Sequence, residues 1–363
     1  MTAAPLSFGA FDGIDLFMPS NALPVAFVDD PVFDRHRSRG HHPERPERLQ
    51  AVRAALGRAQ IELIPVAARD AEDEELLRVH EAAYLDDLTR MTGREGHLDA
   101  DTYIAADSIT AARRAAGSAC SLVDAILEGR ARRGVALLRP PGHHARPDQA
   151  MGFCLLNNIA IAAAHARARG IRRLAIVDWD VHHGNGTQEM FWEDPSVLYV
   201  SVHQSPCFPG TGDASEVGDG EGLGATVNVP LSAGAGDAEY AAAFERVIVP
   251  VLDAFRPELV LVSAGFDAHR NDPIAGMRLD PGSFARMTRY LLDVAERHAS
   301  GRMALLLEGG YDLSGLEASF LASLRTLAGE PLSLPAPGIP GALFAREIER
   351  ARRFASAHWP GLG

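Results

Sequence analysis

The sequence predicts an α/β protein with a mostly parallel central sheet, helices on both faces and a functional site at the carboxyl ends of the strands. Five short apolar runs each end directly in polar residues of catalytic type, and helical patterns separate several of these runs. Alternating strands and helices are typical of parallel sheets covered on both faces. In such sheets ligands bind beyond the carboxyl ends of the strands, which is where these polar residues fall.

The composition is that of an ordinary globular protein. Of the 363 residues, 47% are hydrophobic and 23% are charged, so a large core can form. The formal net charge of -13 argues against nucleic acid as a partner, because phosphate neutralisation requires a basic surface, and it would attract cationic substrates.

The cellular location is predicted to be cytoplasmic. Three cysteines, Cys120, Cys154 and Cys207, form no Cys-x-x-Cys pair, which is typical of a reduced protein. The first basic residue is Arg35, and no apolar run reaches about 18 residues, so we expect neither a secretion signal nor a membrane span.

The first elements follow from local patterns. Residues 1–24 lack periodicity and are predicted to form a loosely held arm, and 25–28 form a first strand. A polar loop then carries His41 and His42, which are either metal ligands or part of a polar rim. Apolar residues at helical spacing predict a helix over 44–59.

The next elements precede the first polar motif. A short strand is expected over 61–66, followed by one or two amphipathic helices over 73–90 and a loop with Gly and Asp over 93–101. An alanine-rich helix over 109–128 has small residues that suit tight packing against a sheet, and Gly129 lies near its end.

The five apolar runs are short enough to be buried parallel strands. They comprise residues 135–138, 174–177, 197–202, 259–262 and 303–307. Helices are predicted between them over 157–169, 238–255 and 281–298. The glycine-rich stretch 208–236 is either a long active-site loop or a surface linker. A connector over 331–340 and a helix over 343–357 follow, and the sequence leaves open whether this helix docks or dimerises.

The polar residues after two of these runs offer metal ligands. Asp178, Asp180 and His182 would share one face if the strand continued, and buried charges without a partner are very costly. Asp180, His182 and Asp267 supply two carboxylates and one imidazole. Three protein ligands plus a water describe a catalytic Zn²⁺ site, although Fe²⁺ or Co²⁺ would accept the same ligands.

The histidine pair His143 and His144 follows a strand and two prolines. A neutral histidine beside a metal site can take a proton from water during attack on a carbonyl, whereas the alternative is a surface pair. Asp178 and Asn185 are the natural orienting partners for these imidazoles. Tyr311, after two glycines, would donate a hydrogen bond to a developing oxyanion or else serve in packing.

Two phenylalanines stand beside glycines near these motifs. Phe153 follows Gly152, and Phe208 precedes Pro209 and Gly210. They would wall a narrow apolar channel that suits a linear alkyl chain with an amide at its tip, or they are core residues.

Together these motifs resemble those of zinc-dependent histone deacetylases and acetylpolyamine amidohydrolases, which share the arginase-deacetylase fold. The matching stretches are HPERPERL (42–49), RPPGHH (139–144), GFCLLNN (152–158), DWDVHHGNGT (178–187), FPGTG (208–212), SAGFD (263–267), DP (272–273) and EGGY (308–311). Asn185 and the first stretch look like the class II branch, which includes bacterial histone deacetylase-like amidohydrolases. The resemblance implies one catalytic domain over 25–330, and we expect the connector and helix of 331–363 to pack on or near it.

The resemblance also implies roles for single residues. Zinc would be held by Asp180, His182 and Asp267, with His144 as general base, His143 as its electrostatic or acid partner and Tyr311 polarising the acyl carbonyl. The tunnel would be lined by Gly152, Phe153, Phe208 and Ile274. K⁺ or Na⁺ would be held by Asp178, Asp180, His182 and Ser201, and a second such ion by Phe191, Asp194 and Val197. Arg48 would face an internal channel for released acetate or lie on a solvated helix face.

The implied reaction removes acetyl or another short acyl group from acyl-lysine or a related acylated amine. Polyamine-selective relatives can carry an acid where this chain has Ile274, which weakens a polyamine assignment, although Asp99, Asp101 or the acids of 213–221 could hold a distal ammonium. A two-manganese ureohydrolase is disfavoured, because Gly184 and His269 stand where further carboxylates are needed. A non-catalytic acyl-ligand binder is disfavoured, because the metal ligands, the histidines and the tyrosine are all present.

Overall fold

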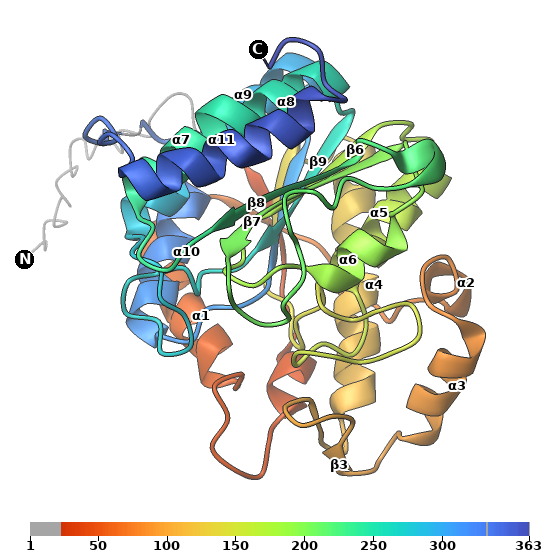
Figure 1. The fold of residues 1–363 in the computed structure, drawn as a ribbon. Helices are drawn as coiled ribbons and strands as arrows, with labels where there is room; N and C mark the ends of the chain where they lie inside the picture. The colour runs from red at the N-terminus through yellow and green to blue at the C-terminus, as the bar shows by residue number, and fades with distance from the viewer. Residues whose placement is uncertain (1–22, 332, 363) are drawn as a thin grey trace, which may run out of the picture.

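The computed structural model describes residues 23–331 and 333–362, so nearly all of the arm predicted over 1–24 lies outside the described residues. Its centre is an eight-stranded sheet with the order β2-β1-β5-β10-β9-β6-β7-β8, in which all neighbouring strands are parallel (Figure 1). The strands are β1 Val25–Val28, β2 Leu63–Pro65, β5 Arg133–Ala136, β6 Leu174–Asp178, β7 Val197–Gln204, β8 Thr226–Leu231, β9 Leu259–Ala264 and β10 Met303–Leu307. The predicted α/β class with a parallel sheet is confirmed.

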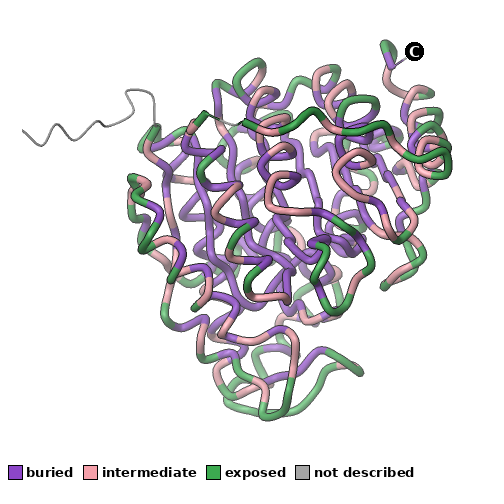
Figure 2. Tube along the Cα trace, turned by 90° about the vertical axis from the view of Figure 1, so that its left-hand side faces the viewer, coloured by how far each residue is buried: buried purple, intermediate pink, exposed green. Residues whose placement is uncertain are grey.

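Helices cover both faces of the sheet (Figure 1). On one face, α4 (Ser108–Leu127) contacts β1 and β5, and α5 (Asn158–Ala168) contacts β6 and β9. On the other, α9 (Pro281–His298) contacts β9 and α10 (Leu313–Leu327), which in turn contacts α1 (Glu47–Ala59). Figure 2 shows the buried strands enclosed between helices whose outer faces are exposed.

Shorter elements complete the described part of the chain. They are the 3₁₀ turns Pro31–Arg35 and Gly220–Gly222, the hairpin of β3 (Gly96–His97) and β4 (Tyr103–Ile104), and the helices α2 Asp73–Leu76, α3 Ala82–Arg90, α6 Asn185–Met190, α7 Asp237–Ala243, α8 Val249–Phe255 and α11 Ala342–Ser356. Within residues 23–331 and 333–362, no helix is long and apolar enough to cross a membrane.

Among the larger elements, β8 and α10 were not indicated by the sequence. The stretch 208–236 is not only loop, because β8 lies inside it and forms the edge of the sheet. An edge strand tolerates polar residues and a proline such as Pro230, so it lacks the continuous apolar run of a central strand. Helix α10 was not predicted, although Asp312 caps it by accepting a hydrogen bond from the Gly315 amide at 2.7 Å.

The helix predicted over 238–255 is interrupted by a π-helical segment, Phe244–Ile248, between α7 and α8. Pro250 at the start of α8 has no amide hydrogen to donate, and a shift of hydrogen-bond register upstream accommodates it.

The C-terminal helix α11 covers the edge of the sheet. It contacts β8 and α7 and buries Ile348, Ala351 and Ala355, and the Trp359 indole donates to the Gly224 carbonyl at 2.9 Å. A covered edge strand cannot pair with another chain, so α11 closes this side of the sheet.

The strand order brings the five polar motifs together. Strands β5, β10, β9, β6 and β7, which carry the five apolar runs, are consecutive neighbours in the sheet. Because all run in the same direction, the segments that follow them meet at one edge. The functional site is assembled there.

Candidate active site

Three predicted ligands converge where β6 and β9 end. His182 Nδ1 lies 3.1 Å from Asp180 Oδ1 and 3.2 Å from Asp267 Oδ2, and all three residues are buried. Their ligand atoms form a group that could hold a metal ion. The expected continuation of the strand is wrong, because β6 ends at Asp178 and the chain then bends, which turns Asp178 toward His143 instead.

The group has the properties of a site built for a cation. Asp267 Oδ2 is buried without a hydrogen-bond partner among the described residues, which is costly for a carboxylate oxygen. Burial and the neighbouring Asp180 carboxylate raise the pKa of Asp267 to about 7. A divalent cation would remove this repulsion and satisfy the free oxygen, so the residues present fit a metal.

Two glycines make room for these carboxylates. A Cβ on Gly265 would lie 2.1 Å from Asp180 Oδ2, and one on Gly309 would lie 2.1 Å from Asp267 Oδ2. The Gly309 amide also donates to Asp180 Oδ2 at 2.8 Å, and the Val181 amide donates to Asp267 Oδ1 at 2.9 Å. The His182 amide donates to Asp180 Oδ1 at 2.9 Å as well, so the backbone orients both oxygens of Asp180 and one oxygen of Asp267, as expected for preorganised ligands.

The histidine pair stands beside the metal group with two different partners. His143 Nδ1 lies 2.9 Å from Asp178 Oδ2, and His144 Nδ1 lies 2.8 Å from Asn185 Oδ1. The two rings are 4.0 Å apart between centroids, and His143 Nε2 is 3.8 Å from Asp180 Oδ1. Because each Nδ1 faces an acceptor, each ring has its Nε2 directed away from its orienting partner.

The partners separate the protonation states of the pair. Burial disfavours an imidazolium at both positions, but the carboxylates of Asp178 and Asp180 outweigh it and raise the pKa of His143 to about 10. Burial and the nearby positive charges of His143 and His182 lower the pKa of His144 well below its ordinary value. At neutral pH the geometry favours a charged His143 beside a neutral His144.

Tyr311 lines the same cavity as the two histidines. Its amide donates to Asp272 Oδ2 at 2.7 Å, and its ring lies under the Arg48 guanidinium, 4.9 Å from ring centroid to Cζ. Phe153 meets the ring edge-on at 6.0 Å between centroids. These contacts hold the ring and leave its hydroxyl at the cavity that both histidines line.

The cavity itself has a volume of about 260 Å³. His143, His144, His182 and Tyr311 line it together with the four predicted tunnel residues, Gly152, Phe153, Phe208 and Ile274. Phe208 packs edge-on against His144 at 5.0 Å between centroids, so the two phenylalanines are walls rather than core residues.

Gly152 allows this close approach. It has a φ of +55°, and a Cβ there would lie 2.6 Å from His144 Cδ2 and 2.9 Å from Phe208 Cε1. A side chain at position 152 would therefore collide with His144 and with Phe208.

Comparison with known proteins decides the family, because the profile of the histone deacetylase domain matches residues 42–327. The chain belongs to the histone deacetylase domain family. It is 43% identical to histone deacetylase 15 of Arabidopsis thaliana over 88% of this chain and 59% of that protein. It is 42% identical to the histone deacetylase-like amidohydrolase of Pseudomonas aeruginosa, over 85% of this chain and 81% of that one.

Two further comparisons extend this result. The chain is 43% identical to the polyamine deacetylase HDAC10 of Homo sapiens, over 88% of this chain but only 50% of the human protein. The crystal structure of the HDA15 HD domain superposes with a TM-score of 0.88 at 39% identity, covering 94% of this chain and 97% of that one. The chain thus spans 59% of its plant relative and nearly all of the solved domain.

The residues proposed for monovalent cations in this histone deacetylase domain fall in two places. Asp178 pairs with Ser201 in the register of β6 and β7, behind Asp180 and His182. Phe191, Asp194 and Val197 lie where α6 leads into β7, where the Phe191 carbonyl accepts from the Asp194 amide at 3.1 Å and the Asp194 carbonyl accepts from the Val197 amide at 3.4 Å. K⁺ or Na⁺ at either place stays a prediction.

The solvated position considered for Arg48 is wrong. Arg48 is 0% exposed, its Nε donates to the Gly310 carbonyl at 2.7 Å, and Nη1 bonds Glu44 Oε1 at 3.1 Å. Glu44 also binds the buried Arg139, whose Nη1 donates to the Phe33 carbonyl at 2.7 Å. This network links HPERPERL to RPPGHH, and the charged residues of the two motifs, Glu44 and Arg48 in the first and Arg139 in the second, were its signal in the sequence.

The sequence gives no site role to Glu308 or Cys207, although it offers Asp101 and His42 as candidates. Glu308 lies under the histidine loop, where its Oε2 accepts from the Gly142 amide at 2.6 Å. Cys207 and Asp101 line the cavity, and the Asp101 carbonyl lies 3.1 Å from His42 Nε2. His42 therefore belongs to the rim, where it also meets Phe153 edge-on at 4.7 Å between centroids.

Proposed function

We propose that this protein is a zinc-dependent amidohydrolase that removes acetyl or other short acyl groups from acyl-lysine or a related acylated amine, releasing a carboxylate and a free amine. One observation carries the proposal. Asp267 Oδ2, buried and without a hydrogen-bond partner among the described residues, lies with Asp180 beside His182, and His182 lines a narrow cavity together with two differently protonated histidines and a tyrosine.

Asp180, His182 and Asp267 would hold the zinc ion, because two carboxylates and an imidazole with an open position suit a catalytic site. When bound, zinc supplies a Lewis acid that lowers the pKa of water and polarises the acyl carbonyl. K⁺ or Na⁺ would bind near Asp178 and Ser201, largely through backbone oxygens. Residues 25–330 would form the catalytic unit, with 331–363 packed onto it.

The two histidines would divide the proton transfers. His144 is neutral, and because its Nδ1 donates to Asn185, the lone pair of Nε2 is free to take a proton from the attacking water. The C–O bond then forms, and Tyr311 donates a hydrogen bond to the developing oxyanion. When the C–N bond breaks, the pair returns a proton to the departing amine, while Asp178 holds the positive charge of His143 in place.

The shape of the cavity supports an acylated straight-chain amine as substrate. Phe153 and Phe208 can enclose a methylene chain, and Ile274 stands at the mouth, 37% exposed and uncharged. An acylpolyamine is the second candidate. Asp101 lines the same cavity, and its carboxylate could hold the distal ammonium of such a substrate. Cytoplasmic location stays a prediction, and all three cysteines are free.

The test is turnover of an acetyl-lysine peptide, with longer acyl-lysine peptides and N-acetylputrescine measured in parallel. With N-terminally blocked acetyl-lysine peptides, an amine-reactive dye detects the released amine, and because the chain contains no lysine the protein adds only its terminal amine to the background. N-acetylputrescine already has a free amine, so its turnover is followed by the acetate released. We expect turnover that a chelator abolishes, that zinc restores and that Asp267→Ala lacks. Undiminished turnover by metal-free protein would reject the proposal, and the ratio of kcat/KM values ranks the two substrate classes.

A further inference from the structure

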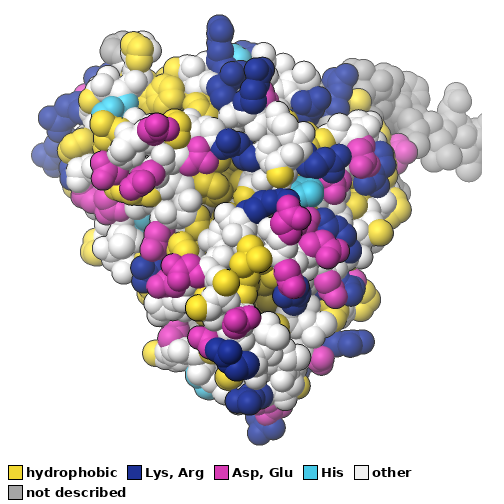
Figure 3. All heavy atoms as spheres, turned by 90° about the vertical axis from the view of Figure 1, so that its right-hand side faces the viewer, with side chains coloured by type: hydrophobic (Ala, Val, Ile, Leu, Met, Phe, Trp, Pro, Cys, Tyr) yellow, Lys and Arg dark blue, Asp and Glu magenta, His cyan; other side chains and the backbone are white. Residues whose placement is uncertain are grey.

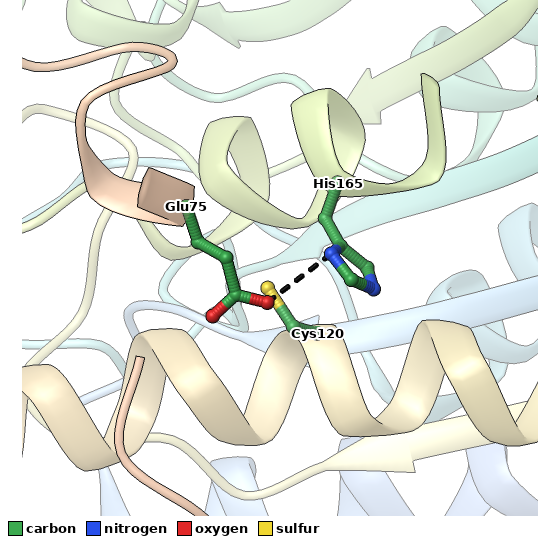
Figure 4. A group of neighbouring side chains, drawn as sticks. All are labelled: Glu75, Cys120 and His165. Carbon is green, nitrogen blue, oxygen red and sulfur yellow. Dashed lines mark ion pairs between the residues drawn. The ribbon is translucent and has the colours of Figure 1, made fainter. Parts of the chain in front are cut away.

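A second cluster of ligand-type side chains lies away from the cavity. Glu75 from α2, Cys120 from α4 and His165 from α5 point toward one another (Figure 4). Their ligand atoms all lie within 4.8 Å of one another, and the residues are only 5%, 0% and 8% exposed. None of the three lines the active-site cavity, so the proposed reaction gives them no role.

The proton of His165 is placed by its other neighbour. His165 Nε2 lies 2.8 Å from Asp124 Oδ1, and a carboxylate accepts, so Nε2 carries the proton. Nδ1 then has a lone pair, which faces Glu75 Oε1 at 3.1 Å and makes no hydrogen bond among the described residues. Two acceptors facing each other in a buried place need a cation between them or a second proton on the ring.

The remaining contacts of Glu75 leave one direction open. Arg69 binds both carboxylate oxygens, Oε1 at 2.5 Å and Oε2 at 2.7 Å, and the Glu72 amide donates to Oε2 at 2.9 Å. Oε1 still has a lone pair, directed to the side where His165 and Cys120 lie. An imidazole whose other nitrogen donates to a carboxylate is the usual arrangement of a metal-binding histidine.

The segment that carries Glu75 is seated firmly on α4. A Cβ on Gly117 would lie 2.3 Å from the Arg69 carbonyl oxygen, so the glycine lets the segment rest directly on the helix. The Ala71 amide donates to the Arg113 carbonyl at 2.9 Å, and Asp70 pairs with Arg114 at 2.6 Å. Glu75 is therefore presented to Cys120 by a backbone held in place, not by a mobile loop.

Figure 3 shows arginine and acidic side chains interspersed on the molecular face turned to the right of Figure 1.

We propose that Glu75, Cys120 and His165 form a second metal site, structural in role, for a divalent cation of the zinc class. Thiolate, imidazole and carboxylate are all zinc ligands, and a tetrahedral site needs ligand atoms roughly 3.3–3.8 Å apart, so small side-chain rotations suffice. Water completes the coordination, Asp124 orients the imidazole, and the ion ties α2 to α4 and α5. Binding releases the thiol proton of Cys120 to solvent.

The first experiment counts zinc in the full chain after loading and dialysis. We expect two zinc ions per chain in the wild type and in Cys207→Ser, and one in Cys120→Ser and in Asp267→Ala. His165→Gln, which can still donate to Asp124, should also bind one. Cys207→Ser is the matched control because it removes a thiol from the cavity. Two ions in Cys120→Ser and in His165→Gln, or none in Asp267→Ala, would overturn the proposal.

The second experiment identifies the ligands with Co²⁺ in the Asp267→Ala and Cys207→Ser double variant. A thiolate ligand produces sulfur-to-cobalt charge-transfer absorption in the near ultraviolet, which we expect here and which Cys120→Ser should abolish. Absence of the band would show that the cluster is not a metal site but an ion-pair network, in which a doubly protonated His165 lies between Glu75 and Asp124. Such a failure leaves the catalytic proposal intact, because acetyl-lysine turnover by the wild type tests that proposal separately.

Discussion

Replacing Tyr311 with phenylalanine removes one hydroxyl and almost nothing else. The ring is 8% exposed and keeps its contacts with Arg48 at 4.9 Å and Phe153 at 6.0 Å, and the backbone amide stays bonded to Asp272 at 2.7 Å. Since these contacts do not involve the hydroxyl, Tyr311→Phe should fold with the stability of the wild type. The variant therefore isolates the hydrogen bond that we assign to the transition state.

The expected loss is in kcat. Removing one donor to a developing oxyanion costs roughly 2.7–4 kcal/mol, which corresponds to a fall of about 10²–10³-fold in kcat. KM should change little, because the interaction forms mainly in the transition state. Steady-state kinetics on an acetyl-lysine peptide, with zinc content measured on the same samples, supplies both constants.

Tyr84→Phe is the matched control. Tyr84 is also 8% exposed, and its hydroxyl donates to the Leu155 carbonyl at 2.6 Å, away from the cavity lining. Losing this bond should cost about 1 kcal/mol of unfolding free energy without changing kcat. If Tyr311→Phe keeps kcat within threefold of the wild type, or if its whole loss appears in KM, the assigned role of the hydroxyl is wrong.

Three further predictions concern metal binding, acid stability and specificity. Gly309→Ala should weaken zinc binding by roughly 10–100-fold in chelator competition, because the added Cβ would push the Asp267 carboxylate away. Unchanged affinity would contradict the role of Gly309 in making room for that carboxylate. Burial and the positive charge of Arg139 lower the pKa of His36 to about 3. Between pH 6.5 and 3 the His36 imidazole is therefore protonated in the unfolded chain but not in the folded protein. Stability is therefore lost as pH falls through that range, by about 2 kcal/mol between pH 6.5 and 5 at 1.36 kcal/mol per unit, and urea unfolding of His36→Asn should lack this part of the slope. Ile274→Glu at the exposed mouth should raise kcat/KM for N-acetylputrescine relative to an acetyl-lysine peptide by about fivefold, or about 1 kcal/mol, and an unchanged ratio would remove position 274 from specificity.

Local patterns predicted the central strands well because those strands are buried on both sides. Strands β6, β9 and β10 are buried along their whole length and appear in the sequence as unbroken apolar runs. Edge strand β8 alternates apolar and polar residues and contains Pro230, so its sequence shows no such run and local patterns predict a loop there. Helix α1 begins at Glu47 and not at the predicted residue 44, because helix ends depend on caps and prolines such as Pro46.

Charge burial was the least predictable property of the sequence. Arg48 and Glu44 are charged residues in and beside a helix, a pattern usually found at a surface, yet both are 0% exposed. Their mutual contact, the Gly310 carbonyl that accepts from Arg48 and the arrival of Arg139 from a distant loop make this burial tolerable. Arg139 is 95 positions from Glu44, so no periodic pattern in the sequence indicates their contact.

The sequence by itself determined which strands are central, which residues follow them and therefore which chemistry the chain can offer. It could not show that β5, β10, β9, β6 and β7 lie side by side, which of the two histidines Asp178 would meet, or that Cys120 meets Glu75 and His165. The periodicity of apolar residues reflects the burial of each helix or strand, so it can be recognised within a short stretch of sequence. Strand order and the meeting of distant side chains depend on how all the helices and strands pack together, and only the tertiary structure contains that information.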